Sequence, residues 1–236
     1  MIRRPPRSTL SSSSAASDVY KRQGDMSTNP NSNSPIAEES GDNKAASQKA
    51  EVEAKQLDTS KISEALKNYS SCHLEIGFGN AKHLCKEAKL NKDTLYIGSE
   101  VYLSGIGSLL ASIIEEGIEN IRIYDQDIRL LLDNKPKEVF DKVVIICPDP
   151  WPKEKHHKRR LINDEFLSIV KRTMKNDSEI YISTDWENYA ESICDSFDRS
   201  DFVTKENLKK KNDFSKFEER GIKEGRRIYE FNYIKK

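Results

Sequence analysis

Acidic side chains recur where short apolar segments end, between residues 73 and 185. The first segment itself contains Glu75, and carboxylates follow the other segments at Glu100, Asp125, Asp127, Asp149 and Asp185. Like charges that are gathered on one edge of a fold repel one another. The pattern therefore indicates a ligand that presents several hydrogen-bond donors to that edge.

The apolar segments alternate with stretches of helical character. Residues rich in β-branched side chains predict strands at 73–76, 94–98, 120–124, 141–146 and 179–183, and residues 226–233 alternate like a closing strand. Helices are expected near 81–90, 103–116, 127–133, 162–175 and 186–197. This alternation predicts an α/β fold with a parallel sheet and helices on both faces. In such folds, ligands bind beyond the carboxyl ends of the strands.

The segment Glu75-Ile-Gly-Phe-Gly79 is typical of a strand-to-helix turn. Two glycines let the backbone approach a ligand closely, although many turns need a Gly-x-Gly for their geometry alone. An acid after the second strand, here Glu100, would accept both ribose hydroxyls of a nucleoside. The third glycine of the dinucleotide pattern is absent, because Asn80 and Ala81 follow. This favours a nucleoside without phosphates, such as S-adenosylmethionine, over NAD.

The segment at 147–152 reads CPDPWP. Both prolines fix φ, and each disfavours helical geometry in the residue before it, so we expect Asp149 to be held extended between them. Trp151 offers a flat face on which a base can stack. The prolines thus predict a rigid loop that presents a carboxylate at the end of the fourth strand.

A basic run follows over residues 153–160, with five Lys or Arg, two His and a single opposing acid. A charged run is more often a solvated helix face than a binding site. Beside the cofactor edge, however, it is well placed to bind phosphates, which supply most nucleic-acid affinity. His156 and His157 have no companion ligands in the pattern, so we predict no metal site and expect RNA contacts or helix packing from them.

Three further motifs have both a structural and a functional interpretation. Asp127 either binds an adenine amino group or caps the helix that begins one residue later. Asp185 either binds a ligand or caps the next helix, and Trp186 either stacks or packs beneath the sheet edge. Ser215-x-x-Glu218 is a capping box, which marks a helix start.

Composition limits the classes of protein. The chain has 236 residues, with 39 acidic and 39 basic side chains, and a balanced total does not exclude a nucleic-acid partner. Its four cysteines form no C-x-x-C pair, which predicts reduced thiols in a cytoplasmic protein. No apolar run reaches the ~20 residues that a membrane span needs.

Residues 1–60 are poor in apolar side chains and predict a disordered tail before a domain over 61–236. The first 25 residues resemble translated adapter or vector sequence more than a transit peptide, and Met26 is expected to be the native start.

Five motifs occur in the order LEIGFGN, Gly98-Ser-Glu100, CPDPWPKEKHHKRR, STDWENYA and SKFEERG. Together they resemble the bacterial tRNA (guanine-N7)-methyltransferase family, over about residues 70–235. The resemblance implies a Rossmann-like, S-adenosylmethionine-dependent methyltransferase fold, with a doubly wound, seven-stranded, mostly parallel sheet whose last strand is antiparallel. It also implies methyl transfer to N7 of a guanine in the variable loop of tRNA.

Carried over by motif position, the resemblance implies three sets of residues. The cofactor would be bound by Glu75, Gly77, Gly79, Glu100, Asp127 and Asp149, of which Asp149 would also be catalytic. The substrate would be bound by Lys153, Asp185, Ser215, Lys216, Phe217 and Glu218. RNA contacts would come from Lys155, His156, His157, Lys158, Arg159 and Arg160. The sequence departs from the family pattern at Ala81, Tyr102, Leu103, Cys147 and Ser215, and none of these changes removes a polar group that the chemistry needs.

Guanine N7 already carries a lone pair, so the reaction needs orientation rather than a general base. A fixed carboxylate, for which we expect Asp149, would stabilise the positive charge that develops on the purine. Lys153 would anchor a phosphate or a base oxygen, and Trp151 would stack a base that is splayed out of its loop.

Three alternatives are a methyltransferase for a small molecule or protein, a non-catalytic tRNA-binding subunit, and a nucleotide-dependent dehydrogenase. The basic run argues against the first, the complete set of site residues against the second, and the missing glycine against the third. With tRNA as partner, we expect no obligate protein partner and a monomer or homodimer.

Overall fold

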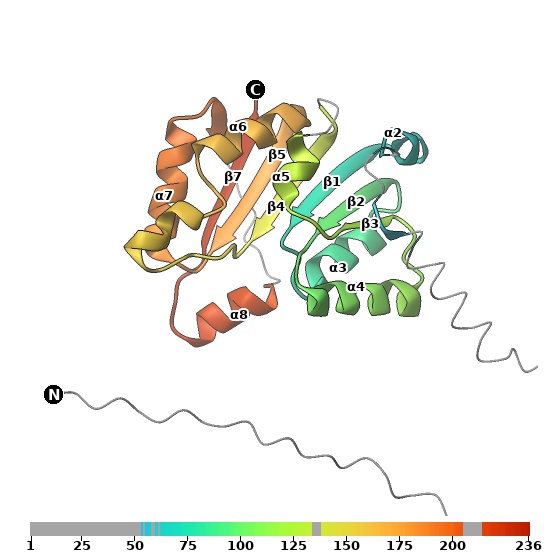
Figure 1. Ribbon diagram of the computed structural model, residues 1–236, viewed down its shortest axis with the longest axis horizontal. Helices are drawn as coiled ribbons and strands as arrows, with labels where there is room; N and C mark the ends of the chain where they lie inside the picture. The colour runs from blue at the N-terminus through green and yellow to red at the C-terminus, as the bar shows by residue number, and fades with distance from the viewer. Residues whose placement is uncertain (1–52, 54, 58–59, 61, 134–137, 205–213) are drawn as a thin grey trace, which may run out of the picture. The chain divides into compact units, whose positions relative to one another are not determined.

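The computed structural model describes residues 53, 55–57, 60, 62–133, 138–204 and 214–236 (Figure 1). They belong to the compact unit that residues 40–236 form. The tail predicted over residues 1–60 lies largely outside the described residues, and the domain boundary at 61 stays a prediction. Within the described part of the chain, no helix is both long enough and apolar enough to cross a membrane.

A seven-stranded sheet forms the centre of this unit, with the order β3-β2-β1-β4-β5-β7-β6. The strands are β1 (Ser71–Ile76), β2 (Thr94–Ser99), β3 (Ile121–Tyr124), β4 (Phe140–Ile146), β5 (Met174–Thr184), β6 (Phe202–Thr204) and β7 (Tyr229–Lys235). The pairs from β3 to β5 are parallel, whereas β7 is antiparallel to both of its neighbours. This confirms the predicted sheet, including the antiparallel last strand.

Helices cover both faces of the sheet (Figure 1). They are α2 (Ile62–Ala65), α3 (Lys82–Leu90), α4 (Leu103–Glu116), α5 (Ile128–Asp133), α6 (Asp164–Thr173), α7 (Glu187–Asp198) and α8 (Lys216–Lys223), with 3₁₀-helices η2 (Leu66–Asn68) and η3 (Glu154–Arg159). Alternate residues of β2 enter two separate cores, Leu95 and Ile97 one of them and Tyr96 the other. One core packs against α5, α6 and α7, and the other against α3 and α4. The doubly wound arrangement follows from this alternation.

The strand order places β1 beside β4, with Ile76 opposite Ile145. The chain leaves β1 toward α3, on one face, and later leaves β4 toward α6, on the other. Ligands of open α/β sheets bind at such a switch point, outside the carboxyl ends of the strands. The turn after β1 and the loop after β4 therefore border the predicted site.

Several predicted boundaries differ from the structure. The helix expected over 162–175 begins after Asn163, whose Oδ1 accepts a hydrogen bond from Phe166 N at 2.9 Å, and it ends at Thr173. Residues 174–175 join β5 instead, because Met174 pairs with Phe140 of β4. The closing strand was expected from residue 226 but starts at Tyr229, and the short strand β6 had not been predicted.

Candidate active site

The turn between β1 and α3 is held in left-handed backbone geometry. Gly77 has a φ of 70° and Gly79 a φ of 56°, which glycine adopts without steric cost. Ala81, at the position of the missing third glycine, also has a positive φ of 60°. A side chain added at Gly77 would meet no atom within 4 Å, so open space lies beside the turn.

Glu100, at the end of β2, connects this turn to the neighbouring strand. Its Oε2 accepts from Gly79 N at 2.9 Å, and its Oε1 accepts from Val101 N at 2.8 Å and Tyr102 N at 3.1 Å. A carboxylate offers about four lone-pair sites, so these three bonds leave room for one further donor. Glu100 thus positions the turn and retains capacity for a ribose hydroxyl.

Glu75 and Asp127, two other residues of the predicted cofactor set, belong to β1 and to the segment after β3, on either side of the strand that ends at Glu100. Glu75 is buried, and its Oε2 lies 2.7 Å from Nδ1 of His83 in α3. The side chain of Asp127 is 53% exposed, and its Oδ1 accepts from Arg129 N at 2.9 Å. The structure therefore confirms the helix-capping interpretation of Asp127 and leaves much of its carboxylate open to solvent.

The loop after β4 has strained backbone at two residues other than glycine. Cys147 has a φ of 47° and Trp151 a φ of 44°, in a region that residues other than glycine rarely adopt. Cys147 N donates to Ser183 O of β5 at 2.9 Å. Asp149 lies between them, exposed, with no hydrogen bond to any other residue that the structure describes. The loop thus presents an available carboxylate at the switch point of the sheet.

Most of the basic run forms the 3₁₀-helix η3, and its lysines face solvent. The His156 ring packs edge-on against Trp151 at 5.9 Å, and the Arg159 guanidinium lies 4.9 Å from the centre of the same indole. His157 Nε2 is buried and has no hydrogen-bond partner among the described residues. The His156 ring therefore packs against the loop that carries Asp149, while Lys153, Lys155, Lys158 and Arg159 form an exposed cationic row.

Arg160 is buried, although the resemblance implies that it contacts RNA. Its side chain is only 4% exposed, and its Nε donates to Pro150 O at 3.0 Å. Its Nη2 donates to Asn188 Oδ1 at 2.8 Å, and the guanidinium lies 4.8 Å from the centre of the Tyr189 ring. Arg160 is therefore bound within the chain rather than exposed with the other cations of the run, and its role as an RNA contact stays a prediction.

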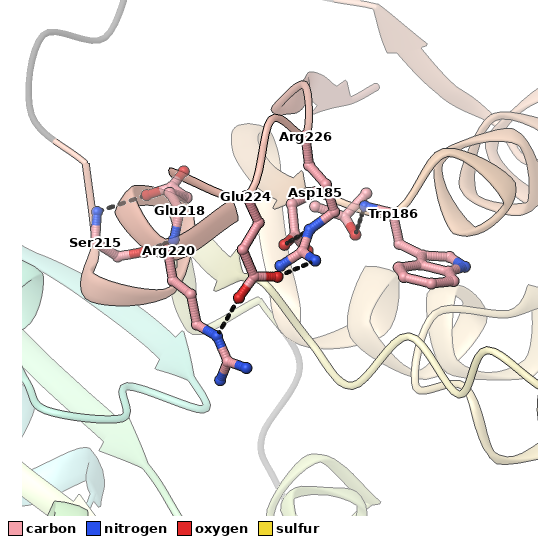
Figure 2. A network of polar contacts seen from close by, with 8 residues as sticks. Asp185, Trp186, Ser215, Glu218, Arg220, Glu224 and Arg226 are labelled. Carbon is pink, nitrogen blue, oxygen red and sulfur yellow. Dashed lines mark hydrogen bonds and ion pairs between the residues drawn. The ribbon is translucent and has the colours of Figure 1, made fainter. Parts of the chain in front are cut away.

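The capping box at the start of α8 is confirmed (Figure 2). Ser215 Oγ accepts from Glu218 N at 3.3 Å, and Glu218 Oε2 accepts from Ser215 N at 2.7 Å. The other oxygen, Oε1, accepts from Ser183 Oγ of β5 at 2.8 Å, and Glu218 is fully buried. Glu218 therefore attaches α8 to the sheet, and this occupies the carboxylate that was expected to bind substrate.

Asp185 belongs to a chain of ion pairs that the sequence did not indicate (Figure 2). Its Oδ2 accepts from Arg226 Nε at 2.8 Å, Arg226 also binds Glu224, and Glu224 accepts from Arg220 Nε at 2.9 Å. These donors lower the pKa of Glu224, Arg220 most and Arg226 next. A Cβ added at Gly221 would lie 2.7 Å from Asp185 Oδ2, so the helix can approach this close only with glycine there.

The alternative interpretation of Asp185 as a helix cap is wrong. The N-cap of α7 is Trp186, and no side chain caps that helix. Trp186 packs against the larger core, which confirms its structural interpretation. Arg226 lies 41 residues from Asp185 in sequence, so no local pattern signals their pairing.

Helix α8 crosses the carboxyl edge of the sheet and contacts the glycine turn. A Cβ added at Gly79 would lie 2.9 Å from Cε2 of Phe217, and Lys82 Nζ lies 3.9 Å from Glu219 Oε1. At its other end, α8 approaches Asp185. Figure 1 shows the helix lying beyond the strand ends on this side of the sheet. The glycine turn, the Asp149 loop, Asp185 and Ser215 therefore all border one edge.

We expect Glu218→Ala to lower the free energy of unfolding by about 1–3 kcal/mol, because it leaves the buried Ser183 Oγ and the partly buried Ser215 N without their acceptor. Urea denaturation measures this loss. The matched control is Glu219→Ala on the same helix, where an exposed and loose ion pair contributes about 0–1 kcal/mol. Equal losses in the two variants would contradict the anchoring role of Glu218.

Comparison with known proteins assigns the family. Residues 69–231 match a family model described as "Putative methyltransferase". A tRNA (guanine-N(7)-)-methyltransferase of Colwellia psychrerythraea is 35% identical over 69% of this chain and 70% of that protein. The protein of the same name from Nitrosococcus oceani is 37% identical over 68% and 70%, and that of Buchnera aphidicola is 37% identical over 75% and 78%.

Solved structures support the same fold. A mutant 16S rRNA (adenine(1408)-N(1))-methyltransferase from Catenulisporales acidiphilia, solved with cosubstrate SAM, has a TM-score of 0.55 at 15% identity and covers 76% of this chain and 92% of its own. The aminoglycoside resistance methyltransferase NpmB1 has a TM-score of 0.54 at 15% identity, covering 77% and 95%. At these identities the likeness concerns the fold alone. From the sequence matches, the chain belongs to the tRNA (guanine-N(7)-)-methyltransferase family.

Proposed function

We propose that this chain transfers a methyl group from S-adenosylmethionine to N7 of a guanine in the variable loop of tRNA. The observation that carries the proposal is the position of Asp149. This exposed carboxylate stands at the switch point of the sheet, between the glycine turn and an exposed row of lysines. The names of the relatives support the tRNA substrate, and a tRNA substrate agrees with the cytoplasmic location expected from the sequence.

The residues around the glycine turn fit a nucleoside sulfonium. Open space lies beside Gly77, Glu100 retains a lone pair for a ribose hydroxyl, and the Asp127 carboxylate is half-exposed. The amides of the turn are already bonded, Gly77 N to Ser99 O and Gly79 N to Glu100, so they do not form a cradle for pyrophosphate. When bound, S-adenosylmethionine supplies an electrophilic methyl group.

The chain's own residues have to orient the guanine rather than deprotonate it. N7 carries a free lone pair, and holding it in line with the methyl group accounts for much of the expected acceleration. Asp149 is placed to accept hydrogen bonds from guanine N1–H and N2–H. The same carboxylate would stabilise the positive charge on the methylated purine, since a fixed charge acts strongly where water is excluded.

The substrate side is formed by Lys153, Asp185 and the start of α8. Arg226 fixes one oxygen of Asp185, so its carboxylate is oriented before substrate arrives. Ser215, Lys216 and Phe217 lie at the first turn of α8, and Phe217 remains 51% exposed. Lys155, Lys158 and Arg159 extend the site outward as contacts for phosphates, which position an RNA without reading its sequence.

Transfer of a labelled methyl group to unmodified tRNA tests the proposal. We expect label in the variable loop, mapped by cleavage at N7-methylguanosine, and loss of label when that loop is deleted. Tight tRNA binding without transfer would favour a non-catalytic subunit. Transfer to another acceptor in the absence of tRNA would favour a different substrate class.

Lys158→Gln is expected to weaken tRNA binding in a salt-dependent way. Removing one phosphate contact should reduce the slope of log affinity against log salt by about 1. Filter binding over a range of salt concentrations measures the slope. Lys92→Gln is the matched control, because Lys92 is exposed before the amino end of β2, at the opposite edge of the sheet. An unchanged slope for Lys158→Gln would remove it from the RNA surface.

A further inference from the structure

Arg160 is the last residue of the basic run 153–160, but it is buried, unlike the other cations of that run. Its side chain is 4% exposed, whereas Lys155, Lys158 and Arg159 are exposed. Burial lowers the pKa of Arg160, but a guanidinium stays charged at neutral pH. A buried charge is costly unless its donors are satisfied. The contacts of Arg160 therefore need an explanation other than RNA binding.

Those contacts join three segments of the chain. Nε donates to Pro150 O at 3.0 Å in the loop that carries Asp149, and Nη2 donates to Asn188 Oδ1 at 2.8 Å at the start of α7. Cζ of the Arg160 guanidinium lies 4.8 Å from the ring centre of Tyr189, which is itself fully buried. Tyr189 Oη in turn accepts from Ile162 N at 2.9 Å. The side chain of Arg160 thus connects the loop to a rigid helix.

The part of the loop that follows Asp149 needs a contact that holds its backbone in place. Cys147 and Trp151 both have positive φ, and strained backbone persists only where its surroundings hold it. Before Asp149, the bond from Cys147 N to Ser183 O supplies that support. After Asp149, Pro150 has no N–H to donate, so its carbonyl is the backbone group available for holding the loop. Arg160 binds that carbonyl.

We propose that Arg160 is a positioning residue for Asp149, which it holds through the Pro150 carbonyl and through Asn188 of α7. The catalytic part of this inference rests on the proposed function, because it assumes that Asp149 acts on the guanine. Arg160 touches neither substrate nor cofactor. Its loss should therefore lower turnover without changing how tRNA phosphates are bound.

Arg160→Lys distinguishes a residue that positions Asp149 from a residue that binds tRNA phosphates. Lysine keeps the positive charge, so it could take over the binding of a phosphate. Its single ammonium group cannot bind Pro150 O and Asn188 together, as the planar guanidinium does. We expect kcat to fall by about 10²-fold, as misplacement of a reacting group by ~1 Å does. KM for tRNA and its salt dependence should remain those of the wild type. Arg172→Gln, an exposed arginine of α6 paired with Asp133, is the control and should keep wild-type kcat.

Two outcomes would overturn the proposal. One is wild-type kcat in Arg160→Lys. The other is a raised KM with a shallower salt slope in Arg160→Gln, as expected for Lys158→Gln, because that would make Arg160 an RNA contact.

Fluorescence of Trp151 tests the positioning role without any assay of activity. In a Trp186→Phe background, Trp151 is the only tryptophan of the chain and reports on the loop. We expect Arg160→Lys to increase quenching of this tryptophan by acrylamide, since the loop loses its attachment to α7. Unchanged quenching would contradict the proposal. Failure of the wild type to methylate tRNA would instead refute the proposed function and leave this measurement valid.

Asn188→Ala tests the same attachment if the arginine variants do not fold. The substitution leaves Arg160 in place and removes only the acceptor of Nη2 on the exposed start of α7. We expect kcat to fall by about tenfold, with KM for tRNA unchanged. Wild-type kcat in this variant would contradict a positioning role for the bond from Nη2 to the Asn188 side chain; the contact of Nη1 with Asn188 O at 3.4 Å is kept in alanine.

Discussion

Asp149→Asn is expected to lower kcat for methyl transfer to tRNA by about 10²- to 10³-fold while the protein stays folded. Asparagine has nearly the same shape as aspartate and fits an exposed loop position that has no bond to another described residue. The substitution removes the charge that would stabilise the positive purine. Single-turnover measurements at saturating cofactor and tRNA isolate this step from binding.

The control for this variant is Glu154→Gln, an exposed acid at the start of η3, which should keep wild-type turnover. Undiminished turnover in Asp149→Asn would rule out the electrostatic role. A tRNA with inosine at the target position, which lacks the N2 amino group, separates charge from base recognition. If Asp149 recognises N2–H, the wild type should discriminate against inosine, and Asp149→Ala, which has no side-chain acceptor, should not.

Gly105→Ala is expected to lower the free energy of unfolding by about 1–3 kcal/mol and to weaken binding of S-adenosylmethionine. Gly105 lies in the first turn of α4, where an added Cβ would be 2.4 Å from Gly79 O and 3.2 Å from Glu100 Cγ. The clash involves backbone, so α4 and the glycine turn have to move apart. Glu100 and Gly79 are the residues whose spacing then changes, and both belong to the predicted cofactor set.

Gly107→Ala is the matched control, two residues farther along the same helix. An added Cβ meets no atom within 4 Å there, and alanine favours helix over glycine by about 1 kcal/mol. Urea denaturation should therefore show Gly107→Ala as neutral or stabilised, and calorimetry should show unchanged cofactor binding. Equal behaviour of the two variants would mean that the approach of α4 to the turn does not shape the site.

Secondary structure was predictable where a local sequence pattern was not overridden by pairing with a distant strand. The range 103–116 was predicted for α4 and observed without change, because its apolar positions recur with helical period and Gly117, in left-handed geometry, ends it. The boundary between α6 and β5 was missed, because pairing of Met174 with Phe140 of β4 overrides local helix preference there. The three-residue β6 is too short to show a period, and it depends on β7 for its pairing.

Within the site, the sequence by itself determined which side chains stand at the carboxyl ends of the strands. Strand periodicity and the βαβ order suffice to bring the glycine turn, Glu100 and Asp149 to one edge. Two local bonding patterns were also predictable, the cap at Asp127 and the capping box at Ser215, because both partners lie within three residues of each other.

Only the tertiary structure decided which charged residues face solvent. Arg160 and Lys158 are alike in sequence context, yet one is buried against Tyr189 and the other is exposed. Glu218 is buried because Ser183 of a distant strand supplies a donor, and Asp185 is fixed by an arginine 41 residues away. A charged side chain is buried only where partners from other segments satisfy it, and those partners are set by how the chain folds rather than by neighbours in sequence.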